Sequence, residues 1–179
     1  MIWAILLVRN IYMTVTAMFF APILPLFALG KDHLPGWLSD FDTPDNPIYG
    51  DSGFRIDHPN DTYWTRVLWL WRNPAYGFDV NVLGRRVYTW PVIVSGDPWI
   101  GNMAAASIGR KTGQSGYCRV KGDGCWEWYY VRQWGNTSKC VRIRLGWKLL
   151  GFAQRADGYP IGGLAQFCFS PNPWMHFDN

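Results

Sequence analysis

The stretch GYCRVKGDGCWEWYYVRQWGNTSKCVRIRLGWKL, residues 116–149, decides the expected fold because two short turn sequences interrupt residues typical of β-strands. Lys121-Gly-Asp-Gly124 and Gly135-Asn-Thr-Ser138 favour tight turns, since Gly, Asp and Asn tolerate the backbone angles that turns require. Between them Val, Tyr, Trp and Ile predominate, as they do in strands. The expected strands are residues 116–120, 125–134 and 139–149. We therefore predict an antiparallel β-meander.

The third of these strands has two chemically different faces, because successive side chains of a strand point to opposite sides. One face carries Val141, Ile143, Leu145, Trp147 and Leu149. The other carries Arg142, Arg144 and Lys148. This alternation predicts a half-buried sheet with one wet, basic face. The three cations are our candidates for binding an anion or a lipid head group.

Outward from the meander, further short strands and one helix are expected. The additional strands are Phe78–Leu83, Arg86–Val94 and Ala165–Phe169, with a loop over residues 96–116. Thr62–Asn73 has helical apolar spacing, with Asp61 as its predicted N-cap and Pro74 as its stop. Residues 31–61 are rich in Pro, Gly, Asp and Asn and are expected to form turns.

An apolar segment begins the chain. Ile11–Gly30 holds twenty residues without a charge, enough for a helix to cross the roughly 30 Å hydrocarbon core of a bilayer. Pro22 and Pro25 disfavour a straight helix, so a kink or a re-entrant hairpin is an alternative to a single span. A cleaved signal peptide and a buried core helix are the others. Arg9, Lys31 and Trp37 are the expected membrane-interface residues.

The expected fold class is α+β: an N-terminal membrane-associated helix, one short amphipathic helix and a mostly antiparallel sheet. We divide the chain into an anchor, residues 1–30, and a Trp-rich β-dominated globular domain, residues 31–179. Of the 179 residues, 17% are aromatic, including 12 Trp, and only 17% are charged, below the roughly 25% of ordinary soluble domains. The net charge of +4 comes without a dense basic block, so nucleic acid is not an expected partner.

Four cysteines, Cys118, Cys125, Cys140 and Cys168, allow three disulfide pairings, and their spacing matches no zinc motif. Whether they are thiols or disulfides depends on the compartment. The few basic residues beside the apolar segment favour a cytoplasmic N-terminus and hence a periplasmic body in a bacterial host, where cysteines pair.

Acidic residues concentrate between the apolar segment and the expected helix. Asp42, Asp45 and Asp51 lie in this turn-rich stretch, residues 42–61, and several carboxylates there could collect around Ca²⁺. Their spacing does not match an EF-hand, and Asp also favours turns and helix caps for local reasons. None of the common nucleophile motifs occurs in the sequence.

Three stretches together resemble a family of uncharacterised proteins encoded by tailed bacteriophages and prophages. They are Phe41–Asp51, Trp69–Phe78, and Arg144–Leu149 followed by Phe169–Pro173. The resemblance implies a viral origin and a bacterial host, and it carries over no activity.

Three functions are consistent with these features. The first is a membrane-anchored accessory protein that acts at the bacterial envelope, in contact with lipid and host envelope proteins. The second is a minor component of the virion, among virion proteins. The third is a metal-dependent enzyme that uses the acidic stretch.

Overall fold

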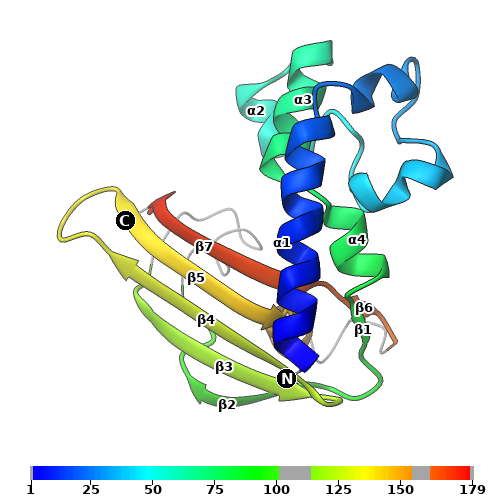
Figure 1. Ribbon diagram of the computed structural model, residues 1–179. Helices are drawn as coiled ribbons and strands as arrows, with labels where there is room; N and C mark the ends of the chain where they lie inside the picture. The colour runs from blue at the N-terminus through cyan, green and yellow to red at the C-terminus, as the bar shows by residue number, and fades with distance from the viewer. Residues whose placement is uncertain (1, 101–113, 155–161, 178–179) are drawn as a thin grey trace. The chain divides into compact units, whose positions relative to one another are not determined.

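The computed structural model describes residues 2–100, 114–154 and 162–177. The chain forms two compact units, Met1–Leu83 and Gly84–Asn179, and the first is helical whereas the second is built on sheets (Figure 1). The predicted α+β class is confirmed. The apolar segment shares its unit with residues 31–83, whereas the sequence predicts a boundary at residue 30.

The first unit begins with α1 (Ile2–Phe20), which starts nine residues earlier than the predicted segment and ends well before Gly30. Ala21 donates the last helical hydrogen bond, to the Ala17 carbonyl. Pro22 has no N–H to continue the ladder, and a 3-10 helix, η1 (Leu24–Ala28), follows. The prolines therefore end the helix, as their position predicts.

Short elements follow η1 and surround a small apolar core. They are η2 (Gly36–Phe41), α2 (Phe54–Asp57), α3 (Tyr63–Arg72) and α4 (Tyr76–Asn81). The core consists of Ala21, Leu24, Ala28, Leu34, Leu38, Ile48 and Leu70, with Phe41 and Tyr49 packed against it. The second half of the apolar segment thus helps to build the core of this unit.

The helix predicted over Thr62–Asn73 is present as α3, but Asp61 is not its N-cap. Thr62 is extended and its hydroxyl accepts from the Thr65 N–H, while the Thr65 hydroxyl accepts from the Thr62 N–H. This reciprocal pair forms a capping box. It leaves the Asp61 carboxylate for a different partner, Arg66.

The strand predicted at Phe78–Leu83 is wrong, because the chain forms α4 there. Helical bonds run from the Asp79 N–H to the Ala75 carbonyl and from the Val82 N–H to the Phe78 carbonyl. A Cβ on Gly77 would lie 1.9 Å from the Ser39 carbonyl oxygen, so only glycine allows this close packing on η2. Packing against η2 overrides the local preference for a strand, and the pattern of residues in the sequence does not reveal such packing.

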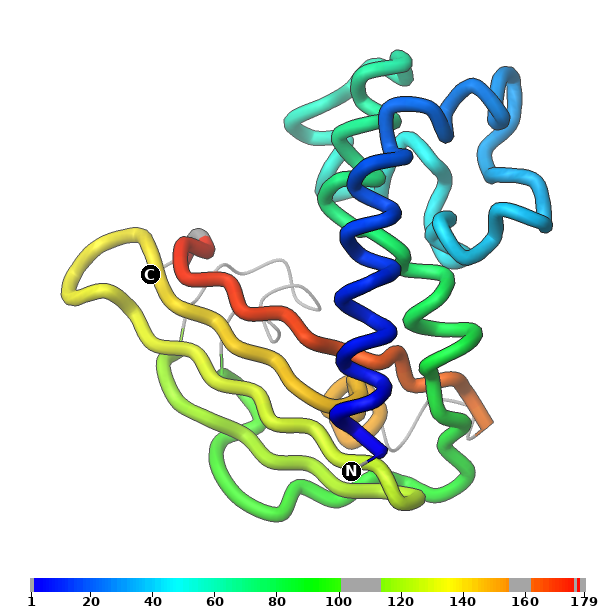
Figure 2. Tube along the Cα trace, viewed as in Figure 1, coloured from blue at the N-terminus to red at the C-terminus, as the bar shows by residue number. Residues whose placement is uncertain are grey.

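The second unit contains a five-stranded antiparallel sheet in the order β2-β3-β4-β5-β7, and the predicted meander is confirmed (Figures 1 and 2). Its strands are β2 (Val92–Gly96), β3 (Gly116–Gly122), β4 (Cys125–Gln133), β5 (Lys139–Trp147) and β7 (Phe167–His176). Two residues with positive φ, Asp123 and Gly124, join β3 to β4 as a tight hairpin requires.

A second, two-stranded sheet pairs β1 (Arg85–Arg86) with β6 (Leu164–Ala165), and a short helix, α6 (Leu150–Gln154), follows β5. The strand expected over Arg86–Val94 is therefore two short strands in different sheets. Most of the loop predicted over residues 96–116 lies outside the described residues.

The two faces of the large sheet differ in burial. Cys118, Val120, Glu127, Tyr129 and Val131 are buried on one face. Tyr117, Arg119, Lys121 and Arg132 are exposed on the other, with Trp128 and Tyr130 half-buried among them. The strand register places Arg144 opposite Tyr129 and Arg142 opposite Val131, on the buried face. The prediction that Arg142 and Arg144 lie on a wet, basic face is therefore wrong.

Candidate membrane-contact surface

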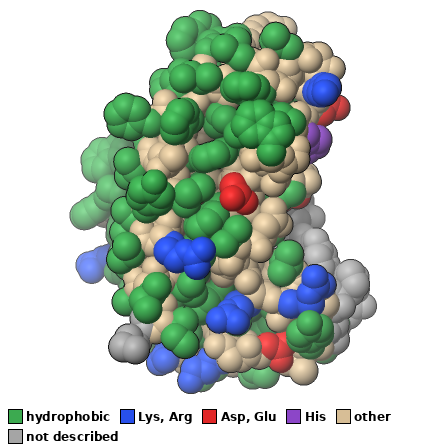
Figure 3. Space-filling model, turned by 45° about the vertical axis from the view of Figure 1, so that its right-hand side comes forward, with side chains coloured by type: hydrophobic (Ala, Val, Ile, Leu, Met, Phe, Trp, Pro, Cys, Tyr) green, Lys and Arg blue, Asp and Glu red, His purple; other side chains and the backbone are tan. Residues whose placement is uncertain are grey.

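Helix α1 exposes apolar side chains along its whole length. Only Asn10 and Ala17 are buried in it. The exposed set comprises Ile2, Ile5, Val8, Ile11, Tyr12, Val15, Met18, Phe19 and Phe20. Figure 3 shows hydrophobic side chains gathered on this part of the molecule. Contact between such an apolar surface and water is unfavourable, and soluble proteins seldom expose a large apolar surface.

By length and composition alone, α1 is the one helix among the described residues that could cross a membrane. Signal sequences and core helices of soluble proteins meet the same criterion. A core helix is mostly buried, whereas 11% of the apolar window in α1 is buried. Its 19 residues correspond to about 28 Å, at 1.5 Å per residue.

The exposed apolar surface continues beyond α1 into η1 and the turn that follows. Ile23, Leu26, Phe27, Leu29 and Trp37 are all exposed. Phe27 and Trp37 meet edge to face, with ring centroids 5.5 Å apart. We call the exposed apolar residues of α1, η1, Leu29 and Trp37 the apolar surface.

The expected interface residues occupy two different places. Lys31 and Trp37 are exposed at the end of the apolar surface, where an interfacial role fits. Arg9 instead lies near the middle of α1, with its guanidinium 5.7 Å from the centre of the Phe78 ring. Beside it Asn10 donates to the buried Asp79 carboxylate at 2.7 Å. This polar pair ties α1 to α4.

Three side chains of α3 satisfy carbonyl groups near the prolines. Trp71 Nε1 donates to the Met18 carbonyl at 2.9 Å, and the Tyr63 hydroxyl donates to the Pro22 carbonyl. The Arg66 guanidinium donates to the carbonyls of Ala28 at 2.6 Å and Lys31 at 3.2 Å. We call Tyr63, Arg66 and Trp71 the carbonyl clamp. In lipid, where water cannot replace a lost backbone partner, such donors are required.

Arg66 is itself held in place by Asp61. Its Nε and one terminal nitrogen each lie 2.6 Å from a carboxylate oxygen, a bidentate pair. The hydrogen bonds from Arg66 lower the pKa of Asp61 below its usual range, and the carboxylate raises the pKa of Arg66. The Asp61 carboxylate and the Arg66 guanidinium therefore both stay charged at neutral pH.

The three carboxylates predicted to hold Ca²⁺ have separate partners. Asp42 is buried, 3.0 Å from His33 Nδ1. Asp45 accepts from the Tyr76 hydroxyl at 3.0 Å, and Asp51 accepts from the Phe54 N–H at 2.7 Å, which starts α2. No group of three His, Cys, Asp or Glu side chains suited to a metal occurs in the described part of the chain. Asp51 therefore acts at the start of a helix, whereas Asp42 and Asp45 contact side chains that are farther away in the sequence.

The three cations proposed for an anion or lipid head group are half-buried, and one of them is the ion-pair partner of the buried Glu127. Arg144 pairs with Glu127, which also accepts from the N–H groups of Leu149 and Leu150 at 2.5 and 2.6 Å. Lys148 donates to the Gln166 side chain, and burial lowers the pKa of Lys148. Arg142 donates to the Ser170 hydroxyl at 3.0 Å. Through Glu127, these interactions connect β4 to β5 and to the start of α6.

The four cysteines are free thiols and all are buried. The register keeps them apart: Cys118 faces Tyr129, four residues along β4 from Cys125, or about 13 Å. Likewise Cys168 faces Gly146, six residues along β5 from Cys140. A disulfide requires Cα atoms within about 7 Å. The fold therefore needs no disulfide, and the pairing expected in a periplasm does not form within this fold.

Sequence reasoning missed the carbonyl clamp and Glu127. A signal for the clamp was present, because Pro22 has no N–H for the Met18 carbonyl, which therefore needs another donor. Glu127 also had a signal, as the one acidic residue within the strands of the large sheet. A lone carboxylate on the buried side of a strand requires a cationic partner.

The fold and this surface define an α+β protein with a largely unburied, apolar N-terminal helix. The chain belongs to a family described as "Family of unknown function (DUF7338)", whose model matches residues 1–178. None of the curated proteins and none of the solved structures matches it.

Proposed function

We propose that this protein is anchored to a lipid bilayer by the apolar surface. The observation that carries the proposal is the exposure of α1, in which only Asn10 and Ala17 are buried and large apolar side chains are exposed from Ile2 to Phe20. Burying this surface in lipid removes it from water, at roughly 25 cal/mol per Å².

The clamp supports the same proposal. A chain that turns at two prolines beside lipid exposes carbonyl groups to a medium without water, at several kcal/mol each. Tyr63, Arg66 and Trp71 supply donors at that point. An arginine near mid-helix, such as Arg9, costs about 2.5–3.5 kcal/mol at a bilayer centre, and the contact of its guanidinium with the Phe78 ring offsets part of this cost.

The resemblance to phage-encoded proteins supplies the setting of the proposal. We infer a phage accessory protein that acts at the membrane of the bacterial host. The four separated thiols remove the disulfide argument for a periplasmic body. The side of the membrane on which the second unit lies is tested by labelling a cysteine introduced at an exposed position with a membrane-impermeant reagent, since the four native thiols are buried.

Membrane flotation of the full chain with vesicles, followed by carbonate extraction, tests the anchor. Val15→Glu places a charge on the exposed side of α1, and Ile56→Glu places one at an even more exposed apolar position of α2, outside the apolar surface. We expect the V15E variant to leave the membrane fraction in carbonate and the I56E variant to remain. Equal retention of both variants contradicts the anchor. Recovery in purified virions, with none in membranes, favours a virion component instead.

A further inference from the structure

The exposed face of the large sheet combines aromatic rings with cations. β3 contributes Tyr117, Arg119 and Lys121, and β4 contributes Trp128, Tyr130 and Arg132. We call these six residues the aromatic–cationic patch. The register sets Arg119 directly opposite Trp128 and Tyr117 opposite Tyr130, so the two kinds of side chain interleave across the strands. The Trp128 and Tyr130 rings are stacked, 8° from parallel with centroids 5.6 Å apart.

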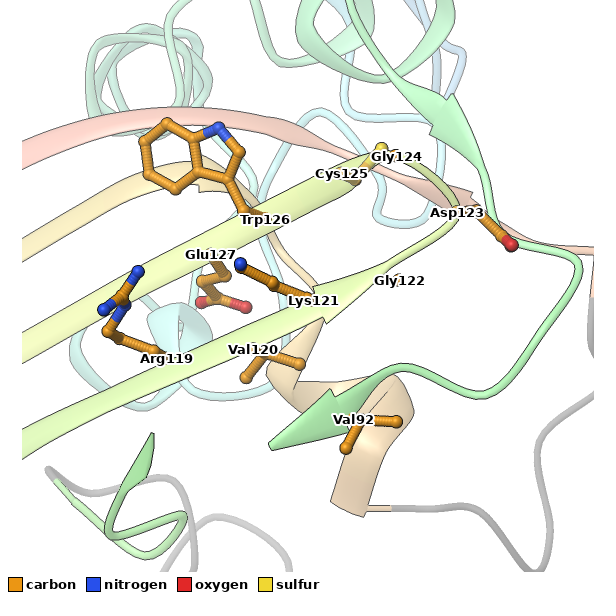
Figure 4. Close-up of a pocket in the computed structure, with 10 residues that line it drawn as sticks. All are labelled: Val92, Arg119, Val120, Lys121, Gly122, Asp123, Gly124, Cys125, Trp126 and Glu127. Atoms are coloured by element: carbon orange, nitrogen blue, oxygen red, sulfur yellow. The ribbon is translucent and has the colours of Figure 1, made fainter. Parts of the chain in front are cut away.

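The patch carries three positive charges and no negative one. Glu127, the one carboxylate in the strands of the large sheet, is buried on the opposite face against Arg144. Figure 4 shows Arg119 and Lys121 on one side of β3 and Val120 on the other. Asp123, in the hairpin turn, accepts from Thr89 and Tyr88 and is engaged there. The free charge of this face is therefore cationic.

An open hollow of about 810 Å³ adjoins the cations. Val92, Arg119, Lys121 and Trp126 are among the residues that line it (Figure 4). Asp123 and Glu127 line it as well, and both carboxylates are engaged by the partners named above. On β5, the strand next to β4, Ile143 pairs with Tyr130 and Leu145 pairs with Trp128. Both aliphatic side chains lie on the same face as the rings and are half-buried. This face thus combines cations and aromatic rings on β3 and β4 with aliphatic side chains on β5.

We propose that the aromatic–cationic patch docks on the surface of a bilayer that contains anionic lipid. Arg and Lys side chains are attracted to acidic head groups, Trp and Tyr prefer the head-group level, and the aliphatic residues of β5 suit the acyl boundary below. A single-stranded nucleic acid would use the cations and rings but has no use for the aliphatic stripe. The inference rests on the proposed anchor, which keeps the sheet near lipid and raises its effective concentration there.

Lys121 reports on docking directly, because it is exposed and reacts with an amine-acetylating reagent. The full chain is incubated with vesicles of phosphatidylcholine alone or with one third phosphatidylglycerol, floated, labelled and analysed by mass spectrometry. We expect labelling of Lys121 to slow roughly tenfold or more on the anionic vesicles, since each cation near such a surface favours docking about fivefold. High salt should restore labelling by screening.

Two paired variants with the same net charge sharpen the test. Arg119→Gln with Arg132→Gln weakens the patch and leaves Lys121 as the reporter, so protection should be lost. Arg85→Gln with Arg86→Gln removes two exposed cations of β1, outside the large sheet, and should keep protection.

The two proposals fail in different ways. Flotation on phosphatidylcholine alone depends on the anchor, so absence from those vesicles overturns the anchor. Equal labelling of Lys121 on both kinds of vesicle overturns the patch. Protection of Lys121 by a single-stranded oligonucleotide, without protection by anionic vesicles, overturns lipid as its occupant.

Discussion

The Trp71 indole donates a 2.9 Å hydrogen bond to the Met18 carbonyl, 53 residues earlier in the chain. In an unbroken helix the residue at position 22 would donate to that carbonyl, but position 22 is proline. We expect Trp71→Phe to lower the free energy of unfolding by about 1 kcal/mol, because the carbonyl loses its donor. Trp64→Phe, at a more exposed position of the same helix, is the control. Denaturant unfolding in detergent micelles measures both, and equal effects would mean that the bond contributes nothing.

Gly77 allows α4 to approach the backbone of η2 closely. Its Cβ would come within 1.9 Å of the Ser39 carbonyl oxygen, a main-chain atom that cannot move aside alone. We expect Gly77→Ala to cost about 1–3 kcal/mol or more, as overpacking does. Gly36→Ala, where a Cβ meets nothing within 4 Å, should have little effect. A G77A variant as stable as the wild type in thermal unfolding would contradict this packing.

Glu127 is the buried counter-charge of Arg144. We expect Glu127→Gln to destabilise the protein by about 3–5 kcal/mol, because it leaves a buried cation without its partner. Replacing both residues, as Glu127→Leu with Arg144→Met, should recover much of the loss, since no uncompensated charge remains. Arg119→Gln on the exposed face is the control, expected within about 0.5 kcal/mol of the wild type. Additive effects of the two replacements in a double-mutant cycle would contradict the pairing.

Asp61 makes the stability of the first unit depend on pH. Arg66 lowers its pKa in the folded state, so the folded protein binds fewer protons than the unfolded chain near that pKa. The contribution is present above the unfolded pKa of about 3.9 and is lost as the pH falls through the lower, folded value. Because Asp61 is more than a third exposed, we expect less than about 1 kcal/mol.

Asp61→Asn should remove that pH dependence. The measurement is the free energy of unfolding of both proteins at pH 7 and at pH values from 5 downward. An unchanged slope in D61N would show that another group is responsible.

The thiols provide a test of the sheet register. Burial raises the pKa of Cys118 to about 11 and also raises those of Cys125, Cys140 and Cys168. We expect no reaction with iodoacetamide in the folded protein at pH 8, and four alkylated thiols in denaturant without reductant. Mass spectrometry counts the adducts. Fewer than four would reveal a disulfide that the register does not allow.

Much of the second unit was predictable from local pattern. Asp123 and Gly124 adopt the positive φ that a two-residue hairpin requires, so the turn and the pairing of β3 with β4 follow from sequence. α3 was found by its spacing, although its cap was placed one residue early. The strand predicted at Phe78–Leu83 was wrong because α4 depends on contact with η2, 35 or more residues earlier in the chain.

The sequence by itself determined the apolar N-terminal segment, its interruption by two prolines and the strand meander, since each depends on neighbouring residues. The tertiary structure alone decided which face of the sheet is buried. The alternation of side chains along β5 places Arg144 and Leu145 on opposite faces of the sheet but does not determine which face is exposed to water. Arg144 lies on the buried face, where it pairs with Glu127 of the adjacent strand. The tertiary structure also brought Tyr63, Arg66 and Trp71 to carbonyls that lie 38 to 53 residues earlier in the chain. Donors and acceptors so far apart in the sequence meet only when the chain folds.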